Sequence, residues 1–287
     1  MVRREGHTGS LTGLDTTPLF PPLHAELIAL LRGLSDADWV RPTLARSWRV
    51  RDIAGHLLDG DLRKLSFGRD GHAVPAVSLP LEPSFADIVQ LIDGLNASGV
   101  AYAARLSPRL LTDLLEVSGR WVSDFVAALP PEADAHFPVA WADEERSTNR
   151  MDIGREYTER WHHQMQIRDA VGAPGLLQRR WFEPLLDLSV HAFRRAYKQV
   201  AAPDGTVVHF EVGGESDYVW SVARADSAWS VTRGRLPQAA ATLRTDADTA
   251  WKLLYNALPR DTMRNRVTVT GDTRLVEPML AARSVMV

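Results

Sequence analysis

The sequence predicts a helical bundle followed by a small α+β domain. Long segments with apolar residues at helical spacing occupy the first two thirds of the chain. Short segments that alternate apolar and polar residues, separated by Gly, Asp and Ser, follow in the last third. The 287 residues suit one large or two modest domains. We place the boundary beside Gly172-Ala-Pro-Gly175, with the bundle over 1–173 and the α+β domain over 174–287.

Helical periodicity extends from about Leu19 to Pro203. Pro130 and Pro131 end one helix, because proline cannot continue the hydrogen-bond ladder. A loop with Pro and Gly separates the second and third helices over 68–83. The expected helices span 22–34, 50–66, 84–105, 108–129, 151–171 and 181–199.

The last third of the chain predicts five strands and two helices. The strand segments are VVHFEV, YVWSV, WSVTR, ATLR and RVTVTG. Thr245, with Asp248 three residues later, predicts the N-cap of a helix over 246–258. Asp272 predicts the cap of a final helix that ends near Ser284.

Composition excludes several classes of function. Lys plus Arg number 33 and Asp plus Glu 36, so the chain lacks the basic surface expected of proteins that bind nucleic acid or anionic membranes. It has no cysteine, which excludes disulfides, thiolate metal sites and a cysteine nucleophile. No apolar run approaches the ~18 residues of a membrane span, and the N-terminus has no apolar core of a signal peptide. We therefore expect a cytoplasmic protein without nucleic-acid or membrane partners.

His56 is the first candidate for a catalytic or metal-binding residue. In SWRVRDIAGHLLDGDLRKL, it lies about 60° from Ile53, just off the apolar stripe of its helix. That position allows the imidazole to reach the bundle interior as a metal ligand. It equally allows a histidine at the core boundary that is hydrogen-bonded to a neighbour.

A second group lies in REYTERWHHQMQIRDAVG. Glu159 and His163 are four residues apart and face the same side of a helix, so both can contact one ion. His162 is turned about 100° from His163 and is not expected to share that ion. The same helix face carries other polar residues and can equally be read as a solvent-facing surface. These residues are Asp152, Glu156, Glu159, His163 and Gln166.

These two segments resemble the maleylpyruvate isomerase-like, mycothiol-dependent branch of the DinB-like metalloprotein superfamily. The matching motifs are W-x-V-R-D-I-x-x-H-L, from Trp48 to Leu57, and E-x-W-x-H, from Glu159 to His163. The strand-rich tail resembles the sterol-carrier-like C-terminal domain found in such proteins. The resemblance implies a DinB-like four-helix bundle that binds a divalent metal, usually zinc, through His56, Glu159 and His163, with water as a fourth ligand.

The resemblance also implies an activity. A low-molecular-weight thiol such as mycothiol would replace the water and, as a thiolate, act on a small electrophilic substrate by isomerisation or S-transfer. Gln166 departs from the pattern, because the isomerase-like helix has an acidic residue three positions after the second histidine. Glu156 is the fallback carboxylate ligand, and either Asp52 or Asp59 is a candidate acceptor that would orient the His56 imidazole.

Two other functions are compatible with these residues. Two histidines and one carboxylate also describe non-haem iron oxygenases. Alternatively, the metal site is structural and the C-terminal domain encloses an apolar ligand among Trp220, Trp229 and Trp251, although packing in the core is the simpler role for these side chains. Arg63 and Arg168 are candidate contacts for an acidic substrate.

Overall fold

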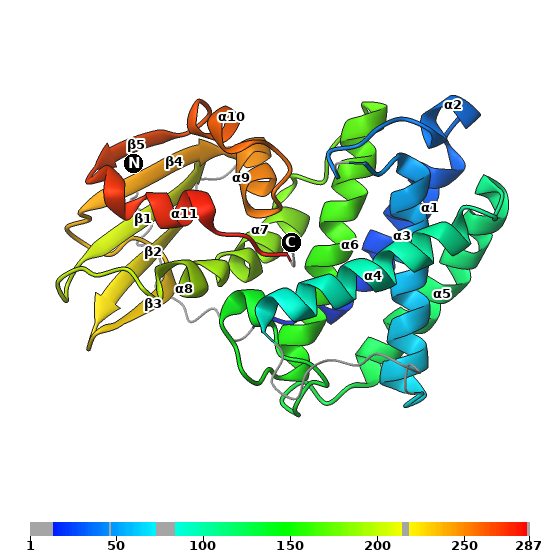
Figure 1. Cartoon of the computed structure of the whole chain (residues 1–287), viewed down its shortest axis with the longest axis horizontal. Helices are drawn as coiled ribbons and strands as arrows, with labels where there is room; N and C mark the ends of the chain where they lie inside the picture. Colours follow the sequence, from blue (N-terminus) through cyan, green and yellow to red (C-terminus); the bar gives the residue numbers. More distant parts are fainter. Residues whose placement is uncertain (1–13, 46, 73–83, 214–217, 286–287) are drawn as a thin grey trace, which may run out of the picture. The chain divides into compact units, whose positions relative to one another are not determined.

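The structure is a computed structural model that describes residues 14–45, 47–72, 84–213 and 218–285 (Figure 1). Most of the N-terminal segment and residues 73–83 of the expected loop lie outside the described residues. The chain divides into two compact units: one contains Asp15–Pro138 and Arg146–Leu176, and the other contains Val139–Glu145 and Leu177–Val285. A short piece between two helices of the first unit, with the 3-10 turn η4 (Ala140–Ala142), thus belongs to the second.

The first unit is a helical bundle, which confirms the predicted fold class. Helices α1 and α3 each contact both α5 and α6, and α4 packs against α3 (Figure 1). A short helix, α2, follows α1, and a π-helical turn, η3, extends α3. The bounds are η2 (Thr17–Leu19), α1 (Phe20–Arg32), α2 (Asp36–Trp39), α3 (Val50–Arg63), η3 (Lys64–Arg69), α4 (Phe85–Ala103), α5 (Pro108–Ala128) and α6 (Asn149–Val171).

Local sequence signals account for the ends of these helices. Ser84 and Asp87 form a reciprocal capping box at the start of α4. The Thr148 hydroxyl accepts a hydrogen bond from the Met151 amide at the start of α6. Gly172 ends α6 with φ of 70°, a left-handed conformation that glycine adopts without strain.

The core of the bundle forms around α3, whose apolar face is fully buried. Gly119 of α5 leaves room for the buried His24 ring of α1: a Cβ atom on Gly119 would lie 2.1 Å from Cε1 of His24. The buried apolar cluster contains Leu27, Ile28, Leu31, Trp39, Val50, Ile53, Ala54, Leu57, Leu58, Ala103, Leu111, Leu115 and Ile167.

The polar face of α6 is not a solvent-facing surface. Asp152, His163 and Gln166 are buried, and Glu156 and Glu159 are partly buried. The solvent-facing interpretation is therefore wrong. The physical reason is that α3 packs against α6, and Lys64 of η3, which extends α3, neutralises Asp152 of α6 there.

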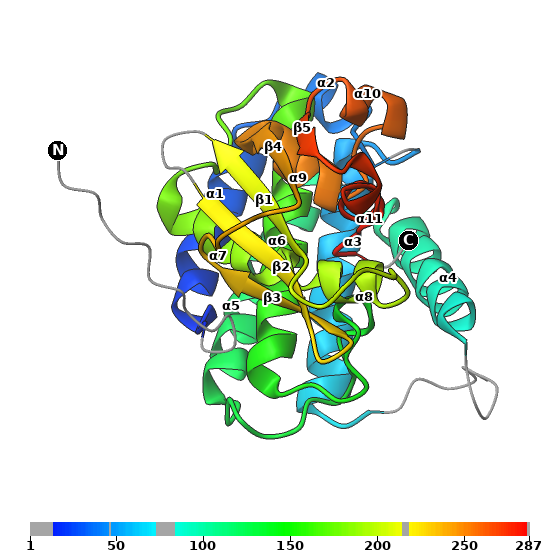
Figure 2. The same ribbon diagram turned by 90° about the vertical axis from the view of Figure 1, so that its left-hand side faces the viewer.

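The second unit contains a five-stranded sheet with the order β3-β2-β1-β4-β5, in which β1 and β4 are parallel and the other neighbours antiparallel. Helices α8 and α9 contact the sheet and lie behind its strands in Figure 2. The bounds are α7 (Arg179–Ser189), α8 (Ala192–Tyr197), β1 (Val207–Gly213), β2 (Tyr218–Ala225), β3 (Ala228–Arg233), β4 (Ala241–Asp246), α9 (Ala247–Leu254), α10 (Arg260–Arg264), β5 (Thr268–Gly271), η5 (Thr273–Leu275) and α11 (Glu277–Ala281).

One face of the sheet is apolar and forms the core of this unit. Phe210 of β1 pairs with Trp220 of β2 and Leu243 of β4, and all three are fully buried. The Phe193 ring of α8 packs edge-on against Phe210, with ring centroids 5.2 Å apart. Trp220 and Trp251 are both fully buried in this core, which agrees with the packing role expected for them.

The structure corrects several predicted helix ends in this unit. Asp246, not Thr245, caps α9 by accepting a hydrogen bond from the Thr249 amide at 2.8 Å. Asp272 caps only the short turn η5, and α11 follows it. The helix expected over 181–199 is divided into α7 and α8. Among the described residues, no helix combines the length and apolar character needed to cross a membrane.

Candidate metal centre

Helices α3 and α6 bring His56, Glu159 and His163 together inside the bundle. Each offers one ligand atom, and these atoms all lie within 4.8 Å of one another. Glu159 and His163 are one helical turn apart, with Oε2 and Nε2 separated by 3.5 Å. The His56 and His163 rings meet edge to face, with centroids 4.6 Å apart. The residues expected to converge therefore do converge.

The spacing and chemistry of this group fit one divalent ion. Ligand atoms about 2.1 Å from a tetrahedral ion lie about 3.4 Å from each other, which matches the 3.5 Å between Glu159 and His163. Nδ1 of His56 is buried and has no hydrogen-bond partner among the described residues. An unpaired buried nitrogen is costly, and a bound cation would satisfy such an atom.

The protonation states of the group also suit metal binding. Burial lowers the pKa of His56 well below its usual value, and the neighbouring His163 lowers it further. Burial alone would raise the pKa of Glu159, but His162, His163 and Arg155 beside it bring its pKa below the usual range. At neutral pH the site therefore holds a neutral His56 imidazole and an ionised Glu159 carboxylate, the forms that coordinate metals.

Gln166 supports the second histidine of the group. Its side-chain oxygen lies 2.9 Å from Nδ1 of His163, and both residues are buried. Sequence reasoning considered only Asp52 and Asp59 as acceptors for an imidazole, and for His56 both were wrong. Asp52 accepts a hydrogen bond from the Arg49 amide in a capping box, and Asp59 forms an ion pair with Arg63.

His162 is buried beside the group but faces another direction. Its Nδ1 lies 2.9 Å from the carbonyl oxygen of Thr158, one turn earlier on α6. Its ring packs on that of His163, with centroids 3.9 Å apart. Burial lowers the pKa of His162 to about 3, so it is neutral at physiological pH. The turn of about 100° between adjacent helical residues thus separates the two histidines as predicted.

Trp48 contributes an aromatic wall to the site. This half-buried residue precedes α3, and its ring centroid lies 4.9 Å from that of His56 and 6.3 Å from that of His163. Two hydrogen bonds from Thr43 to the Trp48 carbonyl hold the preceding turn. Sequence reasoning used Trp48 only as part of a motif and did not assign it to the site.

A network of ion pairs occupies the same face of α6 towards its N-terminus. Lys64, the first residue of η3, pairs with Asp152, and Arg155 contacts both Asp152 and Glu156. Glu156 also lies 3.7 Å from Lys64. Its carboxylate is thus committed to two cations, which leaves Glu159 as the carboxylate nearest the two histidines.

Two arginines considered for substrate binding already have partners. Arg63 pairs with Asp59 at 2.7 Å and donates to Asn96. Arg168 pairs with Glu26 and donates to the carbonyl oxygen of Pro174. Neither guanidinium is free to bind a substrate carboxylate without breaking these contacts.

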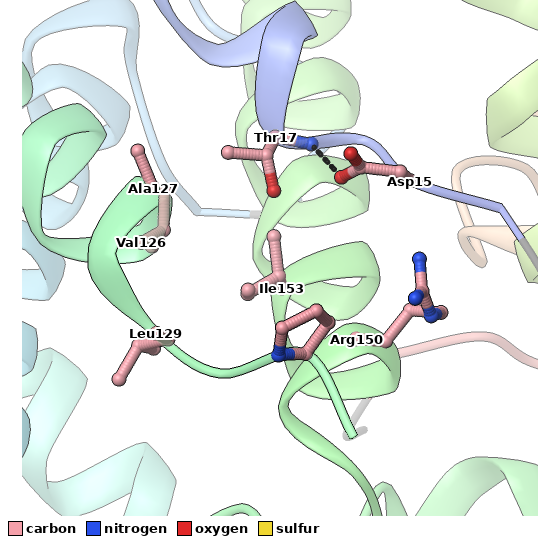
Figure 3. Close-up of a pocket in the computed structure, with 8 residues that line it drawn as sticks. Asp15, Thr17, Val126, Ala127, Leu129, Arg150 and Ile153 are labelled. Atoms are coloured by element: carbon pink, nitrogen blue, oxygen red, sulfur yellow. Dashed lines mark hydrogen bonds between the residues drawn. The ribbon is translucent and has the colours of Figure 1, made fainter. Parts of the chain in front are cut away.

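A small hollow of about 140 Å³ lies elsewhere in the bundle, between the start of the chain, α5 and α6 (Figure 3). Its charged residues have local partners: Asp15 accepts a hydrogen bond from the Thr17 amide, and Arg150 pairs with Glu132. It contains none of the three converging residues. Its lining is Asp15, Thr17, Val126, Ala127, Leu129, Pro131, Arg150 and Ile153.

The bundle and its His–Glu–His group define a helical protein with a candidate metal centre, and comparison with known proteins identifies the family. Residues 20–168 match the sequence model described as the mycothiol maleylpyruvate isomerase N-terminal domain. The chain belongs to this family, since the match covers more than half of its 287 residues. All three converging residues lie within the matched region.

Solved structures show the same overall fold. A crystal structure of a mycothiol-dependent maleylpyruvate isomerase is similar with a TM-score of 0.56 and 12% identity, covering 91% of this chain and 95% of that one. A histidine-to-alanine mutant of the mycothiol-dependent maleylpyruvate isomerase gives a TM-score of 0.53, with the same identity and coverage. At this identity the similarity establishes the fold alone. A search of curated proteins found no match.

Proposed function

We propose that the protein is a divalent-metal-dependent enzyme, with zinc as the metal, that uses a low-molecular-weight thiol such as mycothiol. The reaction is an isomerisation or an S-transfer on a small electrophilic substrate. The observation that carries the proposal is the convergence of His56, Glu159 and His163 in the bundle of this family. The names of the similar structures, which specify a mycothiol-dependent maleylpyruvate isomerase, support the thiol and the reaction class.

The donor set suits a catalytic centre. Two imidazoles and one carboxylate leave a position for an exogenous ligand in a four-coordinate site. Glu159 is the single anionic ligand, so the centre keeps about one positive charge and attracts an anionic thiolate. When bound, the ion would lower the pKa of a thiol so that its thiolate is available at neutral pH.

The chain's own residues hold and shape this centre. His56 and Glu159 lie on different helices, so the packing of α3 against α6 sets their separation. Trp48 covers one side of the two imidazoles and restricts the approach of water, which strengthens electrostatic interactions in the site. The ion pairs of Lys64 and Arg155 keep the neighbouring carboxylates of α6 from competing for the cation.

Metal analysis of purified variants tests the ligand set. The wild-type chain should bind one equivalent of zinc, and His163→Ala should lower the affinity by more than about 100-fold. His24→Ala is the matched control, because His24 is another buried histidine of the bundle and lies outside the group. Circular dichroism confirms that each variant is folded. Equal metal content in His163→Ala and the wild type would refute the ligand set.

Cobalt substitution tests the role of the thiol. Addition of mycothiol to the cobalt protein should produce an intense sulfur-to-metal charge-transfer band that is absent in His163→Ala. Assays with maleylpyruvate and other activated double bonds then identify the substrate. A thiol-independent, oxygen-dependent activity with iron would instead support an oxygenase. Metal binding with neither a thiol band nor turnover would support a structural site.

A further inference from the structure

The hydrogen bond between Gln166 and His163 determines which nitrogen of the imidazole carries the proton. The contact joins Nδ1 of His163 to Oε1 of Gln166 at 2.9 Å. An amide oxygen can only accept a hydrogen bond, so Nδ1 must be the donor. In the neutral form the imidazole has one N–H, so Nε2 then keeps its lone pair. This is the nitrogen that lies 3.5 Å from Oε2 of Glu159.

We infer that Gln166 is a positioning residue, which fixes His163 in the Nδ1–H tautomer and directs its Nε2 lone pair at a divalent cation. The metal part of this inference rests on the proposed function, whereas the tautomer does not. Gln166 is only 4% exposed and His163 only 7%. Water therefore has little access to replace the amide, and the bond holds the ring before any ligand binds.

The two histidines of the group are held differently. Nδ1 of His56 is buried without a hydrogen-bond partner among the described residues, whereas Nδ1 of His163 has Gln166. A hydrogen bond to the remote nitrogen of a ligating histidine fixes the ring orientation and increases the basicity of the ligand. For His163 the remote nitrogen is Nδ1, which Gln166 holds, so loss of this support should weaken metal binding. For His56, Nδ1 is the unpaired nitrogen that a cation would satisfy.

The neutral charge of Gln166 has a second consequence. A carboxylate in this place would add an anion beside His163, in a buried region where charges are weakly screened. The amide provides the same acceptor without that charge, and Glu159 remains the anion of the ligand set. The centre thus keeps its attraction for an anionic fourth ligand such as a thiolate.

The tautomer can be measured without metal. Histidine labelled with ¹⁵N in the metal-free chain, at pH 8, reports through long-range proton–nitrogen correlations which ring nitrogen is protonated. The His163 signals are identified by their loss in His163→Asn. We expect Nδ1–H in the wild type and a mixture, or the Nε2–H form, in Gln166→Met. A wild-type Nε2–H form would overturn the inference, because the amide would then be donating to the ring.

Metal affinity tests the positioning role with three variants. Gln166→Met removes the acceptor and should weaken zinc binding by about 10–100-fold. Gln166→Glu retains an acceptor of the same length and should keep the affinity within about tenfold of the wild type at pH 8. Gln164→Met is the matched control, because Gln164 is a buried amide on the same helix whose side-chain atoms have no hydrogen-bond partner among the described residues.

The outcomes separate this inference from the proposed function. Equal losses in Gln166→Met and Gln164→Met would show a general packing effect and overturn the positioning role. An equal loss in Gln166→Glu and Gln166→Met would also overturn it, since the acceptor would then be irrelevant. A wild-type chain that shows the Nδ1–H tautomer but binds no divalent metal would refute the proposed function and limit Gln166 to setting the tautomer.

Discussion

A buried carboxylate in the second unit provides a quantitative prediction about stability. Asp187 lies on α7, and its side chain is 9% exposed. It accepts hydrogen bonds from Nε1 of Trp220 at 2.9 Å and from Arg233 at 2.8 Å. Arg233 is shared with Glu183, which lies one turn earlier on the same helix, at 2.6 Å. The charge of Asp187 is therefore only partly compensated.

Burial raises the pKa of Asp187 from its ordinary value of 3.8 to about 6, although Arg233 and Trp220 act in the opposite direction. Between about pH 4 and pH 6 the native state thus binds more protons than the unfolded state, and the free energy of unfolding increases as the pH falls through this window. Above pH 6 the ionised group costs the native state at most about 3 kcal/mol.

The variant Asp187→Asn removes this ionisation and keeps an oxygen for the Trp220 indole. We expect it to increase the free energy of unfolding at pH 7.5 by up to about 3 kcal/mol, and to lose this advantage progressively between pH 6 and pH 4. Hydrogen exchange of β1 and β2 peptides in the full chain, corrected for intrinsic rates, measures the opening of this unit directly.

Glu183→Gln is the matched control with the opposite sign. Burial raises the pKa of Glu183, but hydrogen bonds from Arg179 and Arg233 lower it below the usual value. Its contribution is present above its unfolded pKa and is lost as the pH falls through the folded pKa. Glu183→Gln should therefore destabilise the unit at pH 7.5. For Asp187, the reasoning would be refuted if the free energy of unfolding had the same pH dependence in Asp187→Asn and in the wild type.

Two further predictions concern the bundle. Asp61 is fully buried and pairs with Arg160. Asp61→Ala should therefore lower the free energy of unfolding, measured by urea denaturation, by about 3–5 kcal/mol, because the Arg160 cation loses its partner. The double variant Asp61→Ala with Arg160→Met should recover part of this loss. An equal loss in the single and double variants would contradict the prediction. Gly119→Ala places a methyl group 2.1 Å from the His24 ring and should cost about 1–3 kcal/mol. Adding His24→Ala should restore part of the stability that Gly119→Ala loses, as measured by thermal denaturation. If no stability is restored, the methyl group does not act through the His24 ring.

Helical periodicity was sufficient to predict the bundle and the relation between two members of the candidate site. Glu159 and His163 share a face because their spacing matches one turn of α6. This relation depends only on backbone geometry within one helix. The strand segments were equally readable, since alternation of residues such as Val208 and Phe210 reflects the two faces of a sheet.

Helical periodicity did not predict the burial of the polar face of α6. Asp152 and Gln166 look solvent-facing along the sequence, yet both are buried. A polar residue is found in a protein interior when a partner compensates the loss of water. The partner of Asp152 is Lys64, 88 positions earlier in the chain, and no local pattern indicates such a pairing.

The sequence by itself determined the helices, the strands, the absence of cysteine chemistry and the pairing of Glu159 with His163 on one helix face. Periodicity left the place of His56 open; the family resemblance predicted that it joins this pair, and the tertiary structure shows the three residues together. Only the tertiary structure decided that Gln166 rather than an aspartate of α3 supports an imidazole, and that residues 139–145 belong to the second unit. The physical reason is the separation along the chain over which each interaction acts. Periodicity and capping act between residues within a few turns, whereas these contacts depend on the packing of α3 against α6 and on chain segments far apart in sequence.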